Sequence, residues 1–316
     1  MLDTFLIVRK VYYILIAIIG IPVNVMALVI LSRGKCGLST CTTLYLVAMA
    51  VADPLTIIFN VVLGRISYLY FPQTFLHVTP VCSVIVVLAR AATGCSVWFT
   101  VTFTFDRFVA IGCPKLKAKY CTVKTAGVVL TTAGILLCLQ KVPFYFTFEP
   151  AKVIGNVGWF CLQKPSCFTD PSWVAFNSLN TIISPLFPFV LILLLNALTV
   201  KHILVASRVR KGLRGQSKRE NHIDPEMEKR RRSAILLFTI SGNFILMWLV
   251  HLVHFLYYTI DGGDLTLQND SEYILSQSGY MFVSLGCCTN TFIYVVTQSK
   301  FRDQFLNALK YPLSCN

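Results

Sequence analysis

The sequence predicts an all-α integral membrane protein, a bundle of seven transmembrane helices followed by a short cytoplasmic amphipathic helix. Hydrophobic residues make up 55% of the 316 residues and charged residues only 13%, with a mean hydropathy of +0.67. The apolar residues form seven long runs, and a helix that crosses the hydrocarbon core needs about 20 such residues. Basic residues gather in every second connection between the runs, which is the pattern of cytoplasmic loops.

The runs follow one another with short connections, apart from a basic loop near residues 204–232 that we interpret as a solvated extension of two helices. No stretch between them fits a separate soluble domain. We expect a short extracellular amino-terminal segment (residues 1–10), a membrane domain (residues 11–297) and a cytoplasmic helix with its tail (residues 298–316). The predicted spans are residues 11–32, 42–64, 80–112, 124–147, 174–203, 233–260 and 273–297.

Orientation follows from the basic residues. With the amino terminus outside, most Lys and Arg residues fall on the inner face. Arg9 and Lys10, just before the first run, argue mildly for the opposite orientation, but the whole-chain count outweighs them. The net charge of +14 therefore reflects the inner face and predicts contact with anionic membrane lipid. We expect no nucleic-acid partner, because no folded module that binds nucleic acid fits the sequence.

Asp106-Arg107-Phe108 stands at the inner end of the third run. Arg and Asp at membrane depth are costly, by roughly 2.5–3.5 kcal/mol each at a helix centre. An adjacent acid and base at this place therefore indicate a switch or a partner site. The alternative is an ion pair that only supports the structure.

Cys82 differs from most of the twelve cysteines because it lies at the outer end of the third run, in an oxidising compartment. We expect a disulfide with Cys161, which would hold the loop between the fourth and fifth runs across the bundle; Cys167 is the alternative partner. Asn269 begins a glycosylation sequon in the last outer loop. Cys315 follows an amphipathic stretch and is a candidate for palmitoylation, with a free thiol as the alternative.

Five local motifs occur in order on these runs, and together they resemble the rhodopsin-like (class A) G-protein-coupled receptors. Cys82 and Arg107 also stand 25 residues apart, about 37 Å along a helix, as in the third helix of that family. Within the class, the stretches Gly34–Leu46, Cys95–Ile111, Asn196–Gln216 and Cys287–Phe301 look most like the orphan subgroup of G-protein-coupled receptor 139. The motifs are Gly20–Asn24, Met49–Asp53, Asp106–Phe108, Phe244–Trp248 and Asn290–Tyr294.

The resemblance implies that the chain activates heterotrimeric G proteins from its inner face, with arrestin as a further partner. The residues implied in coupling and in the activation switch are Asp106, Arg107, Phe108, Asn290 and Tyr294. Three departures from the family pattern leave the hold on Arg107 unusual: Phe108 replaces a tyrosine, Arg230 stands where some members carry an acid, and Asn196 replaces a tyrosine.

The resemblance also brings Asp53 and Ser96 together in mid-membrane, as the ligands expected for a sodium ion. Gly286 stands where relatives often carry a further polar residue, which weakens this expectation. A hydrogen-bonded network with water and no ion is the alternative. We expect no other cofactor.

Arg90 lies two turns inward from Cys82, and a charge at that depth indicates a functional site. Its guanidinium would suit the carboxylate of a small extracellular ligand or a peptide; snorkelling outward or pairing with an outer-loop acid is the alternative. The resemblance adds Trp248 as the floor of a ligand pocket. His251 and His254 follow one and two turns above it, either as pocket residues or as hydrogen-bonded core.

Two negatives narrow the ligand. Ala89 stands where amine receptors carry an aspartate, and Ser284 where light-sensing relatives carry a lysine. The resembling subgroup is associated with aromatic amino acids and related peptides, so we expect such a ligand.

Two other classes of membrane protein fit the sequence less well than a receptor. A transporter or channel would need a continuous polar path or an inverted repeat, and neither is found in the sequence. An intramembrane enzyme would need paired acids or a nucleophile beside a base, which are also lacking. We therefore expect a receptor of the plasma membrane, multi-pass and without enzymatic activity.

Overall fold

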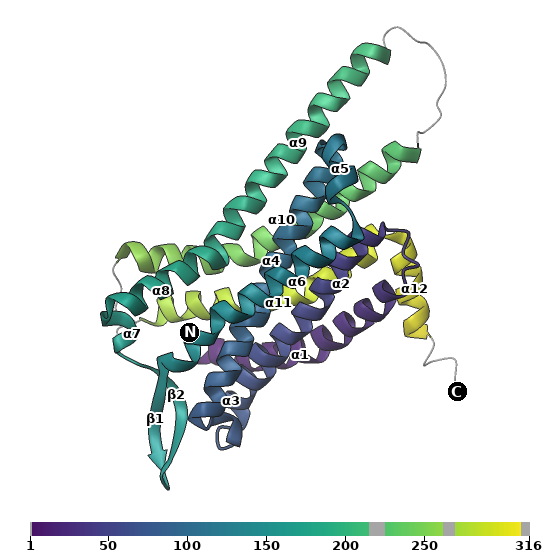
Figure 1. Cartoon of the computed structure of the whole chain (residues 1–316). Coiled ribbons are helices and arrows are strands. Elements are labelled where there is room, and N and C mark those ends of the chain that lie inside the picture. The colour runs from purple at the N-terminus through teal and green to yellow at the C-terminus, as the bar shows by residue number, and fades with distance from the viewer. Residues whose placement is uncertain (1, 215–224, 262–268, 311–316) are drawn as a thin grey trace.

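A computed structural model describes residues 2–214, 225–261 and 269–310 of the chain. Seven of its helical segments are long and apolar enough to cross a membrane, which confirms the predicted fold class (Figure 1). Their bounds lie within a few residues of the predicted ones, except at the start of the first. The spans are Leu2–Ser32, Thr40–Tyr70, Thr79–Gly112, Val123–Thr147, Pro171–Arg208, Arg230–Tyr257 and Asp270–Thr297.

Several spans are built from more than one element, because short π- or 3-10 segments continue an α-helix. The first three spans and the connections that follow them comprise α1 (Leu2–Ser32), α2 (Thr40–Thr56), η1 (Ile57–Ile66), α3 (Ser67–Tyr70), η2 (Phe75–His77), α4 (Thr79–Gly112) and α5 (Pro114–Tyr120). The remainder comprises α6 (Val123–Lys141), η3 (Val142–Thr147), β1 (Phe148–Ile154), β2 (Val157–Gln163), α7 (Ser166–Thr169), α8 (Pro171–Thr181), η4 (Ile182–Leu186), α9 (Phe187–Arg214), α10 (Pro225–Asp261), α11 (Asp270–Thr297) and α12 (Ser299–Lys310).

Helix α1 is longer than the sequence predicts. It begins at Leu2, so the segment expected to precede the first span (residues 1–10) is helical from that residue onward. Large apolar side chains such as Ile7 and Ile18 remain about two-thirds exposed on it (66% and 65%). A helix surface of this kind faces lipid rather than water.

Helix α4 is the central helix of the bundle: it packs against α2, α6, α9 and α10. Helices α10 and α11 also pack along each other. The largest buried apolar cluster of the described residues joins α1, α2, α4, α10 and α11 to α12, at the end of the bundle that the sequence predicts to face the cytoplasm. We call this the inner end, and the opposite one the outer end. These contacts place residues of α4 beside four other spans, so that it can carry interactions from one face of the bundle to the other.

Polar residues mark where the spans begin. Ser39 and Thr122 cap the second and fourth spans, each accepting a hydrogen bond from a backbone N–H three residues on. Asp170 caps the fifth span and Asn269 the seventh in a similar way. Because the first turn of a helix leaves backbone donors unpaired, these caps fix the start of each span.

A two-stranded antiparallel sheet, β1 with β2, lies in the loop between the fourth and fifth spans. Sequence analysis did not predict it. Its turn is formed by Gly155 and Asn156, both with positive φ (55° and 62°), which is the turn geometry that suits a tight hairpin. Figure 1 shows the hairpin at the same end of the bundle as the start of α1, with α12 at the opposite end.

Helix α12 is amphipathic, as expected. Its buried residues are Phe301 and Phe305, whose rings lie 6.2 Å apart. The helix contacts both α11 and α1, and it thus covers the inner end of the first and seventh spans.

Candidate functional site

The inner end of α4 holds a buried ion pair. Arg107 and Asp106 form a salt bridge while only 7% and 4% exposed; the Arg107 Nε also donates to Asp106 at 3.0 Å. A second bond runs to another helix, since Arg107 Nη1 donates to the hydroxyl of Ser233 on α10 at 3.3 Å. Since Arg107 belongs to α4 and Ser233 to α10, this bond links two spans at the inner end of the bundle. We call Asp106, Arg107 and Ser233 the inner latch.

Two cysteine thiols also donate hydrogen bonds to Asp106 of the inner latch. The Cys41 Sγ donates to Asp106 Oδ1 at 3.3 Å, and the Cys121 Sγ donates to the backbone oxygen of Asp106 at 3.6 Å. Burial and the nearby carboxylate raise the pKa of the Cys121 thiol to about 11, so the thiol keeps its proton and remains a donor. Phe108, where the family pattern has a tyrosine, packs its ring 5.7 Å from His202 on α9.

Two other predicted switch residues lie on α11. Tyr294 is 1% exposed and packs edge-to-face on Phe301, with ring centres 5.7 Å apart. Its hydroxyl has no hydrogen-bond partner among the described residues. Asn196, at the position of the missing family tyrosine, accepts a hydrogen bond from Ser241 at 3.1 Å and so links α9 to α10.

Asp53 lies in mid-membrane and is completely buried. One carboxylate oxygen accepts a hydrogen bond from Ser96 Oγ at 2.5 Å, and the other accepts one from Asn290 Nδ2 at 2.8 Å. The structure therefore brings together residues of α2, α4 and α11, as the sequence predicts. Asn24 continues the network on α1 by donating to the backbone oxygen of Cys287 at 2.8 Å.

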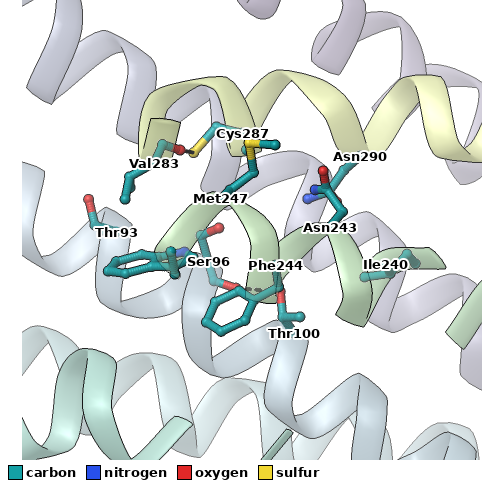
Figure 2. A pocket seen from close by; sticks show the side chains of 12 residues that line it. Thr93, Ser96, Thr100, Ile240, Asn243, Phe244, Met247, Val283, Cys287 and Asn290 are labelled. Atoms are coloured by element: carbon teal, nitrogen blue, oxygen red, sulfur yellow. Dashed lines mark hydrogen bonds between the residues drawn. The ribbon is translucent and has the colours of Figure 1, made fainter. Parts of the chain in front are cut away.

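A small cavity of about 30 Å³ lies beside this network. Ser96 and Asn290, both bonded to Asp53, line it together with Asn243 of α10 (Figure 2). Hydroxyl, amide and carboxylate oxygens are the hard donors that an alkali cation prefers, so the residues fit a sodium ion. The remaining lining residues are Thr93, Thr100, Ile240, Phe244, Met247, Trp248, Val283, Gly286 and Cys287.

A continuous stack of rings runs outward from the floor of the predicted ligand pocket. Trp248 lies 5.6 Å from Phe244 on one side and 5.6 Å from His251 on the other. The His251 ring is 5.1 Å from Tyr280 of α11, and the guanidinium of Arg65, on η1, lies 4.9 Å above the Tyr280 ring. We call this row the aromatic stack; His254 is half-buried one turn above His251.

Helices α10 and α11 approach each other closely beside the aromatic stack. A Cβ at Gly279 would lie 2.9 Å from the Cα of His251 and 3.2 Å from its backbone nitrogen. Contacts below 3.0 Å to backbone are not tolerated, so this crossing requires glycine. The backbone of His251 is thereby held against α11.

Arg90, on α4, lies beside η3 and carries no ion pair to an acid among the described residues. Its guanidinium lies 3.8 Å from the centre of the Phe144 ring, a cation–π contact. One turn deeper, Lys141 is only 4% exposed and donates to the side chain of Asn180 on α8 at 2.8 Å. Sequence analysis did not select Lys141, although the rule that charges at membrane depth are functional by default would have identified it.

A second basic cluster, also missed, lies between α1, η1 and α11. Arg9 and Arg65 both donate to the side-chain oxygen of Gln277, at 3.2 and 3.3 Å. Arg9 donates in addition to the hydroxyl of Tyr273 at 2.5 Å. In the sequence Arg9 counted only as evidence about orientation, and Arg65 followed the predicted second span, so neither stood out.

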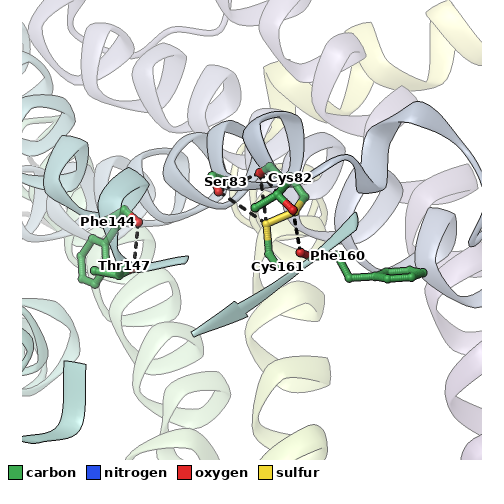
Figure 3. The surroundings of a disulfide bond; sticks show 7 residues. Cys82, Ser83, Phe144, Thr147, Phe160 and Cys161 are labelled. Carbon is green, nitrogen blue, oxygen red and sulfur yellow. Dashed lines mark hydrogen bonds between the residues drawn. A yellow bond between two sulfur atoms is a disulfide. The ribbon is translucent and has the colours of Figure 1, made fainter. Parts of the chain in front are cut away.

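Cys82 forms a disulfide with Cys161 of β2, across a Cα–Cα distance of 6.2 Å. Figure 3 shows the bond between the outer end of α4 and the hairpin. The alternative partner, Cys167, is a buried free thiol that donates to the backbone oxygen of Thr147. The outer end of α4 is therefore covered by β2, and Thr79 Oγ1 adds a bond to the backbone oxygen of Phe160 at 3.0 Å.

Asn269 is exposed, and its side chain accepts a hydrogen bond from the backbone of Glu272 at the start of α11. Its exposure is compatible with the predicted glycan. Cys315 lies outside the described residues.

Residues 23–294 match the family described as "7 transmembrane receptor (rhodopsin family)". The chain is 22% identical to the FMRFamide receptor of Drosophila melanogaster, over 92% of the chain and 52% of that protein. It is 25% identical to Proteinase-activated receptor 2 of Mus musculus, over 95% of the chain and 70% of that protein, and equally to the rat receptor of that name. The chain thus spans about half the length of the first relative, and both the family and these relatives are receptors rather than enzymes.

Proposed function

The chain belongs to the rhodopsin family of seven-transmembrane receptors, and from this premise we propose that it carries signals from an extracellular ligand to heterotrimeric G proteins. The amino terminus and the β1–β2 hairpin would lie outside the cell, and the inner latch would lie at the cytoplasmic face of the plasma membrane. The positive-inside distribution of basic residues supports this orientation.

The inner latch is the observation that carries the proposal. Arg107 is held by a buried carboxylate of its own helix and by a half-buried hydroxyl of α10. A guanidinium has five donors, so it can exchange one set of acceptors for another at low cost. Outward movement of α10 would break the bond to Ser233 and expose Arg107 to a G-protein segment, as a two-state element requires.

Nucleotide exchange on purified G proteins, measured with receptor in nanodiscs, tests the proposal. We expect the Ser233→Ala receptor to show higher basal exchange, because one neutral-to-charged hydrogen bond, about 1.5–3 kcal/mol, no longer holds α10 inward. Arg107→Ala should abolish exchange. Ser241→Ala, on the same helix but bonded to Asn196 of α9, is the matched control and should leave the Arg107 contacts intact. Exchange that persists in Arg107→Ala would refute the proposed role of the latch.

For the ligand, we propose a small molecule or peptide with an aromatic and an acidic group that enters between the hairpin and Trp248. His251 and His254 would line its path, and Arg90 would bind its acid in place of the Phe144 ring. The resemblance of four stretches of the sequence to the orphan subgroup of G-protein-coupled receptor 139 supports an aromatic ligand. The name of the FMRFamide receptor supports a peptide. A screen of such compounds with Arg90→Gln as the variant tests it: an acidic agonist that acts equally on both receptors would contradict the role of Arg90.

We further propose a sodium ion at Asp53 and Ser96. The ion would link α2 to α4, and Asn290 would extend its coordination to α11. The side-chain oxygens of Ser96, Asn243 and Asn290 in the adjoining cavity support it.

The remaining proposals concern the surface and the tail. The basic inner face would contact anionic lipid and, after activation, arrestin. Asn269 would carry a glycan and Cys315 a palmitoyl chain. Mass spectrometry of the receptor from a mammalian cell membrane tests both modifications.

A further inference from the structure

Arg9 and Arg65 come from different spans and converge on one neutral acceptor. Each donates from Nη1 to the single side-chain oxygen of Gln277. Among the described residues, neither arginine forms an ion pair with an acid. Two guanidinium groups within reach of one oxygen repel each other, and an amide oxygen neutralises neither charge. The pair therefore lacks the anion that such an arrangement stabilises.

Two buried donors beside the pair are also unused. Within the described part of the chain, the Nε of Arg9 has no hydrogen-bond partner, and neither does the hydroxyl of Tyr13, one turn along α1. Tyr13 is 1% exposed, and its place four residues after Arg9 puts both side chains on the same face of α1. An unpaired buried donor costs about 1–3 kcal/mol, so the site is under-satisfied in donors as well as in negative charge.

Of the two acids in the first turn of α11, Asp270 and Glu272, the second accepts a hydrogen bond from the Asn269 side chain at 3.2 Å. Among the described residues, neither forms an ion pair with an arginine. Arg9, Arg65 and Gln277 are themselves half-buried rather than enclosed, so a group from outside can reach them. Carboxylate and phosphate oxygens accept several charge-assisted bonds at once, and guanidinium is the side chain best matched to them.

We propose that Arg9, Arg65, Tyr13 and Gln277 form a binding site for an anionic group, a carboxylate or a phosphate, between α1, η1 and α11. Bound oxygens take the two guanidiniums and the free Tyr13 hydroxyl as donors, and Gln277 then serves one arginine instead of two. The site is separate from Arg90, which lies on α4 against Phe144. The anion is carried either by a soluble acid or by an acidic lipid of the outer leaflet.

Occupancy of this site also reaches the aromatic stack. Arg65 lies over the ring of Tyr280, which contacts His251 and through it Trp248. An anion that draws Arg65 towards Arg9 removes a cation from the face of Tyr280, a contact worth about 0.5–2 kcal/mol. This consequence, unlike the binding site, rests on the proposed receptor function.

Binding is tested without G protein, with purified full-chain receptor in nanodiscs of neutral phosphatidylcholine. The soluble probe is N-acetyl-L-phenylalanine, with its uncharged amide as the matched control compound. The lipid probe is phosphatidic acid mixed into the nanodiscs. The dissociation constant follows from the rise in melting temperature with probe concentration.

We expect at least one acidic probe to stabilise the receptor and the uncharged amide not to. Arg9→Gln and Arg65→Gln should each weaken binding by about 10- to 100-fold, and Tyr13→Phe by about 2- to 10-fold. Lys10→Gln removes an exposed cation next to Arg9 and should leave binding unchanged, as should Arg90→Gln. Tyr13→Phe removes one oxygen only, so it keeps the test valid if an arginine variant folds poorly.

Stabilisation by the soluble acid supports a soluble source, and stabilisation by phosphatidic acid alone supports a lipid source. The proposal is overturned if neither acidic probe stabilises the receptor, if the amide binds as tightly as the acid, or if Lys10→Gln weakens binding as much as Arg9→Gln. It is also overturned if only Arg90→Gln loses affinity. Because no signalling is measured, failure here leaves the proposed receptor function intact, and failure of G-protein exchange leaves this site intact.

Discussion

The contact between Lys141 and Asn180 allows a quantitative test of how the bundle accommodates a buried charge. The ammonium and the amide are 4% and 6% exposed, and Asn180 provides a side-chain oxygen at 2.8 Å. Removing Asn180 leaves a buried charge short of an acceptor, whereas removing both partners leaves an apolar interface. Loss of one partner of a buried charge is strongly destabilising, and replacement of both is often neutral.

We therefore expect Asn180→Leu to lower the free energy of unfolding by about 1.5–3 kcal/mol, the worth of a hydrogen bond to a charged group. At roughly 2–4 °C per kcal/mol for a chain of this size, the melting temperature falls by roughly 3–12 °C. Adding Lys141→Met should restore most of this loss, because the charge no longer has to be accommodated. The melting temperature of the single Lys141→Met variant should lie between those of Asn180→Leu and the double variant.

The assay is thermal unfolding of the four receptors in one detergent, analysed as a double-mutant cycle. Cys138→Leu, an exposed position of the same helix α6, is the control and should not change the melting temperature. If the double variant is no more stable than Asn180→Leu, the two side chains are not coupled. If Lys141→Met is the least stable of all, the ammonium itself stabilises the bundle and the reasoning is wrong.

Two further predictions concern the helix crossing and the sodium proposal. Gly279→Ala places a Cβ 2.9 Å from the backbone of His251 and should destabilise the receptor by about 1–3 kcal/mol. Gly242→Ala is the control: a Cβ there has nothing within 4 Å, so this variant should be neutral or stabilising. Equal melting temperatures of the two variants would contradict the close crossing. The melting temperature should be higher in sodium chloride than in potassium chloride. At a sodium concentration ten times the dissociation constant of the ion, binding adds about 1.4 kcal/mol to the free energy of unfolding. Asp53→Asn should abolish this difference, and an equal response to both salts in the unmodified receptor would exclude the sodium site.

The fold could be predicted because its signals are local in the sequence. Each span is a long apolar run, and five of the seven carry a motif whose distance from a helix end fixes its depth. Asp106 and Arg107 were therefore predicted at the inner end of α4, and Asp53 at mid-membrane. Depth follows from counting residues along a helix, and the counts agree with the structure.

Helix faces could not be predicted in the same way. A membrane helix is apolar on its lipid face as well as on its packed face, so periodicity does not reveal which neighbour a residue meets. Sequence analysis placed Arg90 at the right depth and left snorkelling or an outer-loop acid as the alternatives, but it did not show that a phenylalanine of the fourth span would cover the guanidinium. The depth of Lys141 was available from the sequence, but its partner, Asn180, was not, because Asn180 lies on another span.

The β1–β2 hairpin was missed for a different reason. Gly155-Asn156 between two short runs is a recognisable turn signal, but it stands in a loop that hydropathy treats only as a connection. The basic cluster of Arg9 and Arg65 was missed because the two arginines are far apart in the sequence. Only packing of α1 against η1 and α11 brings them together.

The buried hydroxyl of Tyr294 has a consequence for the resting balance of the molecule. A donor left unpaired in this arrangement raises the free energy of the arrangement by about 1–3 kcal/mol. Since every 1.4 kcal/mol changes a population ratio tenfold, any arrangement that gives this hydroxyl an acceptor gains roughly 5- to 150-fold in relative population. In the receptor function proposed above, the inner latch and the unpaired tyrosine would oppose each other, and the difference between their free energies would set how often the receptor opens without a ligand.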